Sequence, residues 1–168
     1  YWYEYTIGKN KSIAFIASSS QSPQELYLLA TLESTPKKLT NFNAEVRNIP
    51  LGKQETFSWK SDEFALNGIL TFPPDFDPTK KYPLVVEPHG GPMTTSKESF
   101  NPSTQLKTAH GYIVFQPNYR GSDNMGYSFS EAINGDAGAG PGRDVMRGLT
   151  ELKKRSYIDS SKIAVTGW

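Results

Sequence analysis

Three short apolar runs in the second half of the chain, at residues 84–86, 112–116 and 163–166, most constrain what this sequence can fold into. Each run is bounded by proline, glycine or polar residues, which is typical of a strand covered on both faces by helices. Segments with helical signals separate the runs. Strand, helix, strand, helix, strand is the pattern of a doubly wound, mostly parallel α/β sheet.

The two intervening helices are predicted from their ends. Asn101-Pro102 resembles an N-cap followed by proline at the first helical position, and Gly111 ends that helix. The second helix follows Pro141 and closes on the cations of residues 153–155, which suit the negative carboxyl end of a helix dipole.

The amino-terminal part carries a different signal. Runs of aromatic and β-branched residues at 1–5, 13–17, 25–31 and 38–42 are separated by polar turns, which predicts an antiparallel β meander. Such a unit is about the size of one β-propeller blade. The spacing alone favours an ordinary four-stranded meander.

Between residues 43 and 53 the chain becomes polar and contains Pro50 and Gly52, as connectors do. We therefore predict two domains, a β meander over residues 1–48 and an α/β domain over residues 49–168. The second domain opens with a hairpin, whose arms at 55–60 and 64–72 turn at residues 61–63.

Composition excludes several classes of protein. With 18 Lys+Arg, 17 Asp+Glu and a net charge of +1, nucleic acid is not an expected partner. No cysteine and only two histidines leave no disulfide, no thiolate or three-histidine metal site and no cysteine nucleophile, so we expect neither a metal nor a cofactor.

Targeting signals are also missing from the sequence. No apolar run approaches the roughly 20 residues of a membrane span, and no signal-peptide pattern is present. A soluble protein is expected. The chain begins without an initiator methionine, so a cytoplasmic and a periplasmic or secreted location both stay open.

The sequence His89-Gly90-Gly91-Pro92 directly follows the first buried strand, at the end where ligands bind in α/β sheets. Glycines let backbone N–H groups turn toward a ligand, and two such groups aimed at one point stabilise an oxyanion. A tight turn that needs glycine explains the motif equally well. His89 is interpreted as a hydrogen-bonded loop residue, because the triad histidine of an α/β-hydrolase follows the nucleophile in chain order.

The third apolar run ends in Gly167-Trp168. In an α/β-hydrolase the nucleophile lies in Gly-x-Ser-x-Gly at the end of a buried strand. Gly167-Trp168 fits the first two positions of that motif. The pair is a weak signal by itself, and its position after the third strand strengthens it.

Four stretches of sequence together resemble one family. They are residues 82–86 running into His89-Gly90-Gly91-Pro92, residues 116–122, residues 134–136 with 142–145, and residues 159–168. In this order they are similar to the first half of the catalytic domain in the prolyl oligopeptidase family of serine peptidases, closest to its acylaminoacyl-peptidase and dipeptidyl-peptidase branch. Residues 13–46 resemble the last blade of the β-propeller that precedes this domain. One departure is Ala137, where that branch often has tryptophan.

The resemblance implies a function. It implies the first half of an α/β-hydrolase domain of a serine peptidase, which hydrolyses short peptides through an acyl-enzyme. The catalytic serine, acid and histidine would all lie beyond Trp168. The chain alone is then expected to be inactive, with the missing carboxyl-terminal half of its own domain as partner. A homo-oligomer is left open.

The resemblance also assigns residues. The N–H of Gly91 would supply one oxyanion donor, with Gly90 shaping the loop, and Asn118 and Tyr119 would line the substrate groove. Arg120 is interpreted as pinning a loop through an ion pair. Asp136 and Asp144 precede the nucleophile, so neither is expected to be the triad acid. Both are interpreted as helix or loop anchors.

Two other functions stay in view. A carboxylesterase can carry a His-Gly-Gly loop on the same fold, although the amino-terminal β region argues against it. A binding module that has lost catalysis is the alternative from another class. A serine followed by x-Gly after Trp168 would favour an enzyme.

Overall fold

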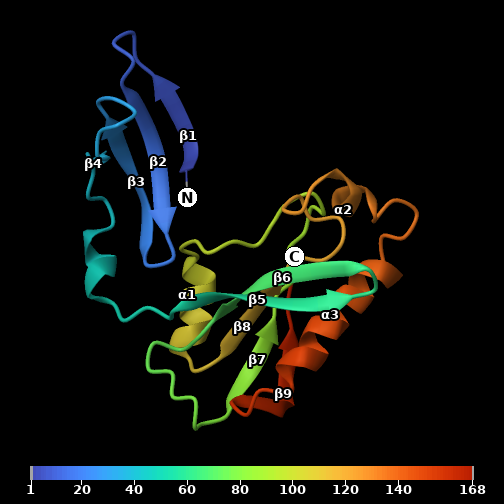
Figure 1. The fold of residues 1–168 in the computed structure, drawn as a ribbon. Helices are drawn as coiled ribbons and strands as arrows, with labels where there is room; N and C mark the ends of the chain where they lie inside the picture. Colours follow the sequence, from blue (N-terminus) through green and yellow to red (C-terminus); the bar gives the residue numbers. More distant parts are fainter. Residues whose placement is uncertain (1, 168) are drawn as a thin grey trace. The chain divides into compact units, whose positions relative to one another are not determined.

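The structure is a computed structural model that describes residues 2–167, with the backbone alone for residues 2 and 3. Its internal contacts define two compact units. Unit 1 is the chain up to residue 51 together with residues 99–103, and unit 2 comprises residues 52–98 and 104–168. Figure 1 labels the strands and helices that belong to these units. The domain limits expected from the sequence, 1–48 and 49–168, stay a prediction.

Unit 1 is a four-stranded antiparallel sheet, so the predicted meander is confirmed. Its strands lie side by side in sequence order. They are β1 (Trp2–Ile7), β2 (Ile13–Ser19), β3 (Ser22–Leu29) and β4 (Lys37–Lys38). The last strand is much shorter than predicted, and a 3₁₀ helix, η1 (Ala44–Asn48), occupies the expected connector.

The carboxylate of Glu25 explains why β4 stops early. It accepts hydrogen bonds from the Thr40 hydroxyl and from the N–H groups of Phe42 and Asn43, the last two at 3.2 Å, and it pairs with Lys38 at 3.2 Å. These donors, with Thr40 first, lower the pKa of Glu25 to about 2. Backbone groups that could extend a β ladder thus bond to a side chain instead.

Unit 2 is built on a five-stranded mixed sheet. Its strands are β5 (Gln54–Ser61), β6 (Phe64–Thr71), β7 (Tyr82–Val86), β8 (Ile113–Pro117) and β9 (Ile158–Val165), arranged in the order β5-β6-β8-β7-β9. Strands β8, β7 and β9 are parallel, as predicted. The β5–β6 hairpin adds two antiparallel pairings, because a two-residue turn at Asp62-Glu63 reverses the chain.

Strand β9 begins five positions earlier than the predicted run of residues 163–166. Its first part pairs through Tyr82 and Ile158, before a shift in register, and contains the polar residues 159–162. These residues are mostly exposed, so their polarity concealed the strand.

Helices cover both faces of this sheet. They are α1 (Pro102–Ala109), the short α2 (Tyr127–Glu131), which was not predicted, and α3 (Ala139–Leu152). Successive side chains of β8 point to opposite faces. Phe115 packs against α3 at Gly148, whereas Gln116 donates to Thr104 of α1 at 3.4 Å. No helix within residues 2–167 has the length and hydropathy needed to cross a membrane.

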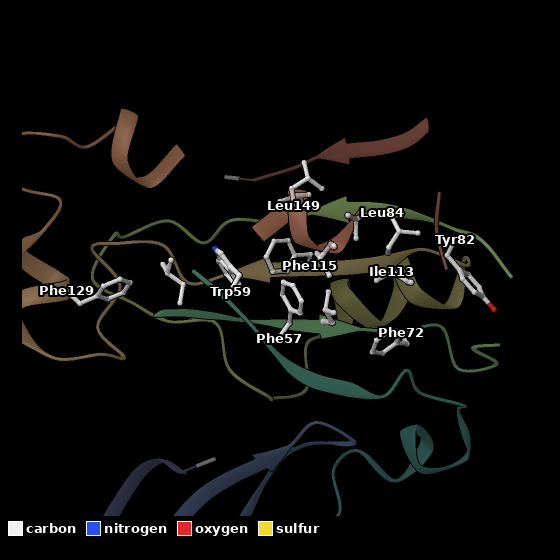
Figure 2. Packing of buried hydrophobic residues seen from close by; sticks show 14 residues of the cluster. Phe57, Trp59, Phe72, Tyr82, Leu84, Ile113, Phe115, Phe129 and Leu149 are labelled. Carbon is white, nitrogen blue, oxygen red and sulfur yellow. The ribbon is translucent and has the colours of Figure 1, made fainter. Parts of the chain in front are cut away.

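The main core of unit 2 lies between the sheet and α3 (Figure 2). Three aromatic rings interlock there: Phe115 meets Trp59 and Phe57 edge to face, with centroids 5.3 and 5.9 Å apart. The core also contains Leu66, Leu70, Phe72, Tyr82, Leu84, Val86, Ile113, Phe129, Leu149, Leu152 and Ile158. This packing fixes β7 and β8 side by side, and with them the loops at their carboxyl ends.

Candidate active site

The candidate site lies where the parallel strands β7 and β8 end. Loops 87–101 and 118–126 leave the sheet at the same edge, which is where ligands bind in open α/β sheets. A pocket of about 470 Å³ opens between these loops and α3. It is lined by Pro88, Gly91, Pro92, Tyr119, Ile133, Ala137, Pro141, Gly142 and Val145. The structure therefore brings together Gly91 and Tyr119, which belong to two separate sequence motifs.

The backbone at Gly91 needs glycine. Its φ of +133° lies in a region that side chains rarely adopt, and a Cβ atom there would meet Thr94 Cγ2 at 2.9 Å. Gly90 and Gly91 are both exposed. Within residues 2–167, the N–H of Gly91 donates no hydrogen bond. A ligand at this edge therefore meets a free backbone donor.

His89 is a hydrogen-bonded loop residue, as predicted. Its Nε2 lies 2.9 Å from Ser122 Oγ and its Nδ1 lies 3.1 Å from the Gly90 carbonyl oxygen. Burial lowers the pKa of His89 below its usual value of 6.5, so the imidazole is mostly neutral at pH 7.

Tyr119 packs on His89. The two rings stack with centroids 4.6 Å apart, and the Tyr119 hydroxyl donates to the His89 carbonyl oxygen. Burial raises the pKa of this phenol. Tyr119 thus lines the pocket, while its hydroxyl is hydrogen-bonded to the loop that carries His89.

Asn118 is buried and its amide is fully engaged. Its Oδ1 accepts the Ser96 N–H at 2.7 Å, and its Nδ2 donates to the Ser96 carbonyl at 3.0 Å and to Asn67 Oδ1 at 2.9 Å. The side chain therefore ties loop 87–101 to β6, and Asn118 does not line the pocket.

Arg120 pins this loop through ion pairs, which confirms its predicted role. Its Nε and Nη2 donate to the two carboxylate oxygens of Asp144 at 2.9 and 2.7 Å, and its backbone N–H donates at 2.8 Å. The Asp144 side chain is 0% exposed. A second bond of 2.6 Å reaches Asp62 in the β5–β6 turn. Asp144 raises the pKa of Arg120, and Arg120 holds the pKa of Asp62 below its usual value.

Asp136 anchors the start of α3, also as predicted. Its carboxylate oxygens accept the N–H groups of Ala139 and Gly140, each at 2.8 Å. Such bonds satisfy donors that the first turn of a helix leaves unpaired.

Gly167 lies at the same edge of the sheet. The N–H of Thr166 donates to the Val86 carbonyl at 2.9 Å, and a Cβ atom at Gly167 would lie 3.7 Å from the Pro88 carbonyl oxygen. The first residue of the expected nucleophile motif thus neighbours the glycine loop. Trp168 lies outside the described residues.

Sequence reasoning missed three polar residues of the site, Ser122, Ser96 and Asn67. Ser122 is buried and contacts His89, and the other two hold Asn118. An isolated serine in a loop, or an isolated asparagine in a strand, carries no sequence signal for such a contact. Within residues 2–167, no cluster of three or more His, Cys, Asp or Glu side chains could hold a metal ion.

Comparison with known proteins agrees with this geometry. Residues 98–168 match the model of the prolyl oligopeptidase family. Dipeptidyl-peptidase 5 of Porphyromonas gingivalis is 31% identical over 153 residues, which cover 89% of this chain and 22% of that protein. An uncharacterized peptidase of Bacillus subtilis is 34% identical over 158 residues, covering 91% of this chain and 24% of that protein.

A solved structure shows the same fold. The acylaminoacyl peptidase of Pyrococcus horikoshii superposes with a TM-score of 0.87 at 24% identity, covering 99% of this chain and 27% of that one. The fold is therefore of the α/β-hydrolase type, with a glycine loop at the carboxyl edge of its sheet. The chain belongs to the prolyl oligopeptidase family. It spans about a quarter of the length of the relatives it matches.

Proposed function

We propose that this chain forms the last propeller blade and the amino-terminal half of the catalytic domain of a serine peptidase that hydrolyses short peptides. The observation that carries the proposal is the unbonded N–H of Gly91, held at positive φ in the loop whose Pro88 carbonyl oxygen neighbours Gly167. The names of the relatives, dipeptidyl-peptidase and acylaminoacyl peptidase, support the reaction class.

In the proposed mechanism, a serine that follows Gly167-Trp168 attacks the peptide carbonyl and forms an acyl-enzyme. The Gly91 N–H donates to the oxygen as negative charge develops there, so it stabilises the transition state more than the bound substrate. Gly90 leaves room for the loop to approach the substrate. The acid and histidine of the triad come from the carboxyl-terminal half of the same domain.

Tyr119 and Asn118, both in loop 118–126, are assigned different roles. Tyr119 lines the pocket and is proposed to contact the substrate. The interpretation of Asn118 as a substrate-binding residue is not favoured, because its amide is buried and bonded to Ser96 and Asn67. We propose instead that Asn118 positions the loop.

A serine-directed fluorophosphonate tests the reaction class. The complete protein that carries this segment should be labelled at one serine and should release short peptides. The 168-residue chain alone should stay unlabelled, because it would lack the triad. Labelling of the short chain would contradict the proposal. Cleavage of esters without peptides would favour a carboxylesterase, and no labelling of the complete protein would favour a binding module.

Substitution of Gly91 by valine in the complete protein tests the oxyanion donor. The side chain clashes with Thr94 and displaces the loop, and loss of one oxyanion donor costs on the order of a hundredfold or more in kcat. The Michaelis constant should change far less. Gly111→Val is the matched control, because Gly111 has a φ of +83° and open space around it. The control should lose stability but keep the kcat of the parent per titrated serine. If Gly91→Val also keeps the kcat of the parent, Gly91 is a turn residue and not an oxyanion donor.

A further inference from the structure

The hydroxyl of Tyr119 holds loop 87–101 just before its two glycines. It donates to the carbonyl oxygen of His89. Within residues 2–167, no other main-chain group of residues 88–91 is hydrogen-bonded to another segment. The ring of the same tyrosine lines the pocket. One side chain therefore contacts the pocket with its ring and the loop with its hydroxyl.

The protons around His89 have one consistent arrangement. The Ser122 hydroxyl donates its proton to the Tyr119 carbonyl oxygen at 2.6 Å. The Ser122 oxygen therefore accepts, at 2.9 Å, the proton on Nε2 of the neutral imidazole. Nδ1 then has no proton for the Gly90 carbonyl oxygen, so the imidazole does not hold that peptide. Three hydrogen bonds, each with its own donor, form a cycle through Tyr119, His89 and Ser122.

The carboxyl side of the two glycines is held by the same loop 118–126. The N–H of Asp123 donates to the Thr94 carbonyl oxygen at 3.2 Å, and the N–H of Thr94 donates to the Pro92 carbonyl oxygen at 2.7 Å. The side chain of Thr94 packs against Gly91, where a Cβ atom would lie 2.9 Å from Thr94 Cγ2. Gly91 is thus held from its carboxyl side, so the direction of its N–H depends on how the chain enters from His89.

Two peptide planes lead from His89 to Gly91. A donor that holds a carbonyl oxygen fixes the whole planar peptide, so the Tyr119 hydroxyl fixes the plane of the His89–Gly90 peptide. The next plane, Gly90–Gly91, carries the N–H of Gly91. Glycine adopts positive and negative φ with similar ease, so this second plane can turn unless the chain on both sides of it is held.

We propose that Tyr119 acts through its hydroxyl as a positioning residue, which holds the His89 carbonyl and thereby keeps the Gly91 N–H at the place where the oxyanion develops. The inference rests on the function proposed above. It divides Tyr119 into two parts: the ring contacts the bound substrate, whereas the hydroxyl acts on the transition state through the loop. Loss of the hydroxyl alone should therefore lower kcat and leave KM nearly unchanged.

Two tyrosine variants of the complete protein test this division. Tyr119→Phe removes the hydroxyl and keeps the ring. Tyr82→Phe is the matched control, because both tyrosines are 9% exposed and each bonds a loop through its hydroxyl. Tyr82 lies in the core at the amino end of β7, away from the site, and its hydroxyl accepts the N–H of Asp77 at 2.8 Å (Figure 2). Each variant loses one such hydrogen bond, but only Tyr119→Phe releases the loop that carries Gly91.

The readouts are kcat and KM per fluorophosphonate-titrated serine, together with the melting temperature. We expect Tyr119→Phe to lose roughly fivefold to fiftyfold in kcat, less than removal of an oxyanion donor, with KM within about twofold of the parent. Tyr82→Phe should lower the melting temperature by a similar amount and keep the kcat and KM of the parent. Ser122→Ala should lose kcat about threefold to tenfold, because the imidazole of His89 loses its acceptor while Tyr119 still holds the carbonyl.

A kcat for Tyr119→Phe equal to that of the parent, or an equal loss of kcat in Tyr82→Phe, would overturn the positioning role and leave the proposed function intact. A rise in KM without a fall in kcat would also overturn it, because the hydroxyl would then act in substrate binding. If the parent itself is neither labelled nor active, the proposed function fails, and this inference fails with it. Should Tyr119→Phe not fold, Ser122→Ala decides: a kcat equal to that of the parent overturns the inference.

Discussion

The two units of this chain are stabilised in different ways. In unit 1, the buried hydrophobic side chains among the described residues are Phe15 and Leu29, whereas unit 2 contains all the others. Unit 1 instead buries a carboxylate, Glu25, whose side chain is 1% exposed. Unit 2 also buries a carboxylate, Asp144, but adds it to a continuous apolar core.

The apolar surface differs as well. In unit 1, Ile7 and Leu32 are 61% and 76% exposed and border a hollow of about 450 Å³. A four-stranded sheet with bare apolar side chains needs a cover to be stable. This is the surface expected of a propeller blade beside its neighbours, as proposed above. Packing specifies the structure of unit 2, and side-chain hydrogen bonds specify much of unit 1.

The largest expected effect comes from the buried ion pair of unit 2. Asp144→Ala leaves the Arg120 guanidinium with only Asp62, and breaking a buried pair costs about 3–5 kcal/mol in the free energy of unfolding. Denaturant unfolding with hydrogen exchange over β5 and α3 measures the loss. Asp62→Ala removes the more exposed partner and is the control, with a much smaller loss. Equal losses would show that burial does not set the strength of this network.

A smaller effect tests how tightly unit 2 is packed. A methyl group at Gly148 of α3 would lie 2.9 Å from both the Phe115 and Trp59 rings, so Gly148→Ala should cost about 1–3 kcal/mol. Gly142→Ala, in the same helix, has open space and should be neutral or stabilise by up to about 1 kcal/mol. The melting temperatures of the two variants give the comparison. If both variants are equally stable, the core beside α3 is looser than the structure indicates.

The sequence predicted much of unit 2 because its signals there are local. The apolar runs of β7 and β8 mark buried strands, and proline or glycine ends each segment. The short α2 carries no periodicity over its five residues, and the polar stretch in β9 concealed a strand. In unit 1, β4 was predicted too long because Glu25, many residues away in sequence, captures its backbone donors.

The candidate site was predictable only as motifs. The family resemblance led us to expect Gly91 as an oxyanion donor and Tyr119 beside the substrate, and the structure places both on one pocket. The environment of Asn118 was not predictable, because its partners Ser96 and Asn67 come from separate segments. The same holds for Ser122, whose contact with His89 joins two loops. Long-range hydrogen bonds of this kind leave no periodic pattern in a sequence.

The smallest expected effect occurs only at low pH and only in unit 1. The pKa of Glu25 is lowered from its usual 4.5 to about 2 in the folded protein, because Thr40, Asn43, Lys38 and Phe42 donate to the ionised form. A lowered folded pKa contributes stability above the unfolded pKa, and that contribution is lost as pH falls through the folded pKa. Protection of residues 40–43 from hydrogen exchange should therefore decrease between about pH 4.5 and pH 2, while the β5–β6 hairpin of unit 2 stays protected.

Glu25→Gln sharpens this last test. The variant keeps the shape of the side chain but has no charge, and its NH₂ group cannot accept the N–H donors of Phe42 or Asn43. Its protection over residues 40–43 should be low at pH 6 and unchanged down to pH 2, whereas the parent should approach it only in acid. The comparison uses protection factors corrected for the intrinsic pH dependence of exchange. A parent whose protection is flat over this range, or a variant that follows the parent's acid profile, would show that the Glu25 carboxylate does not hold this segment, and unit 1 would then depend on its apolar contacts as unit 2 does.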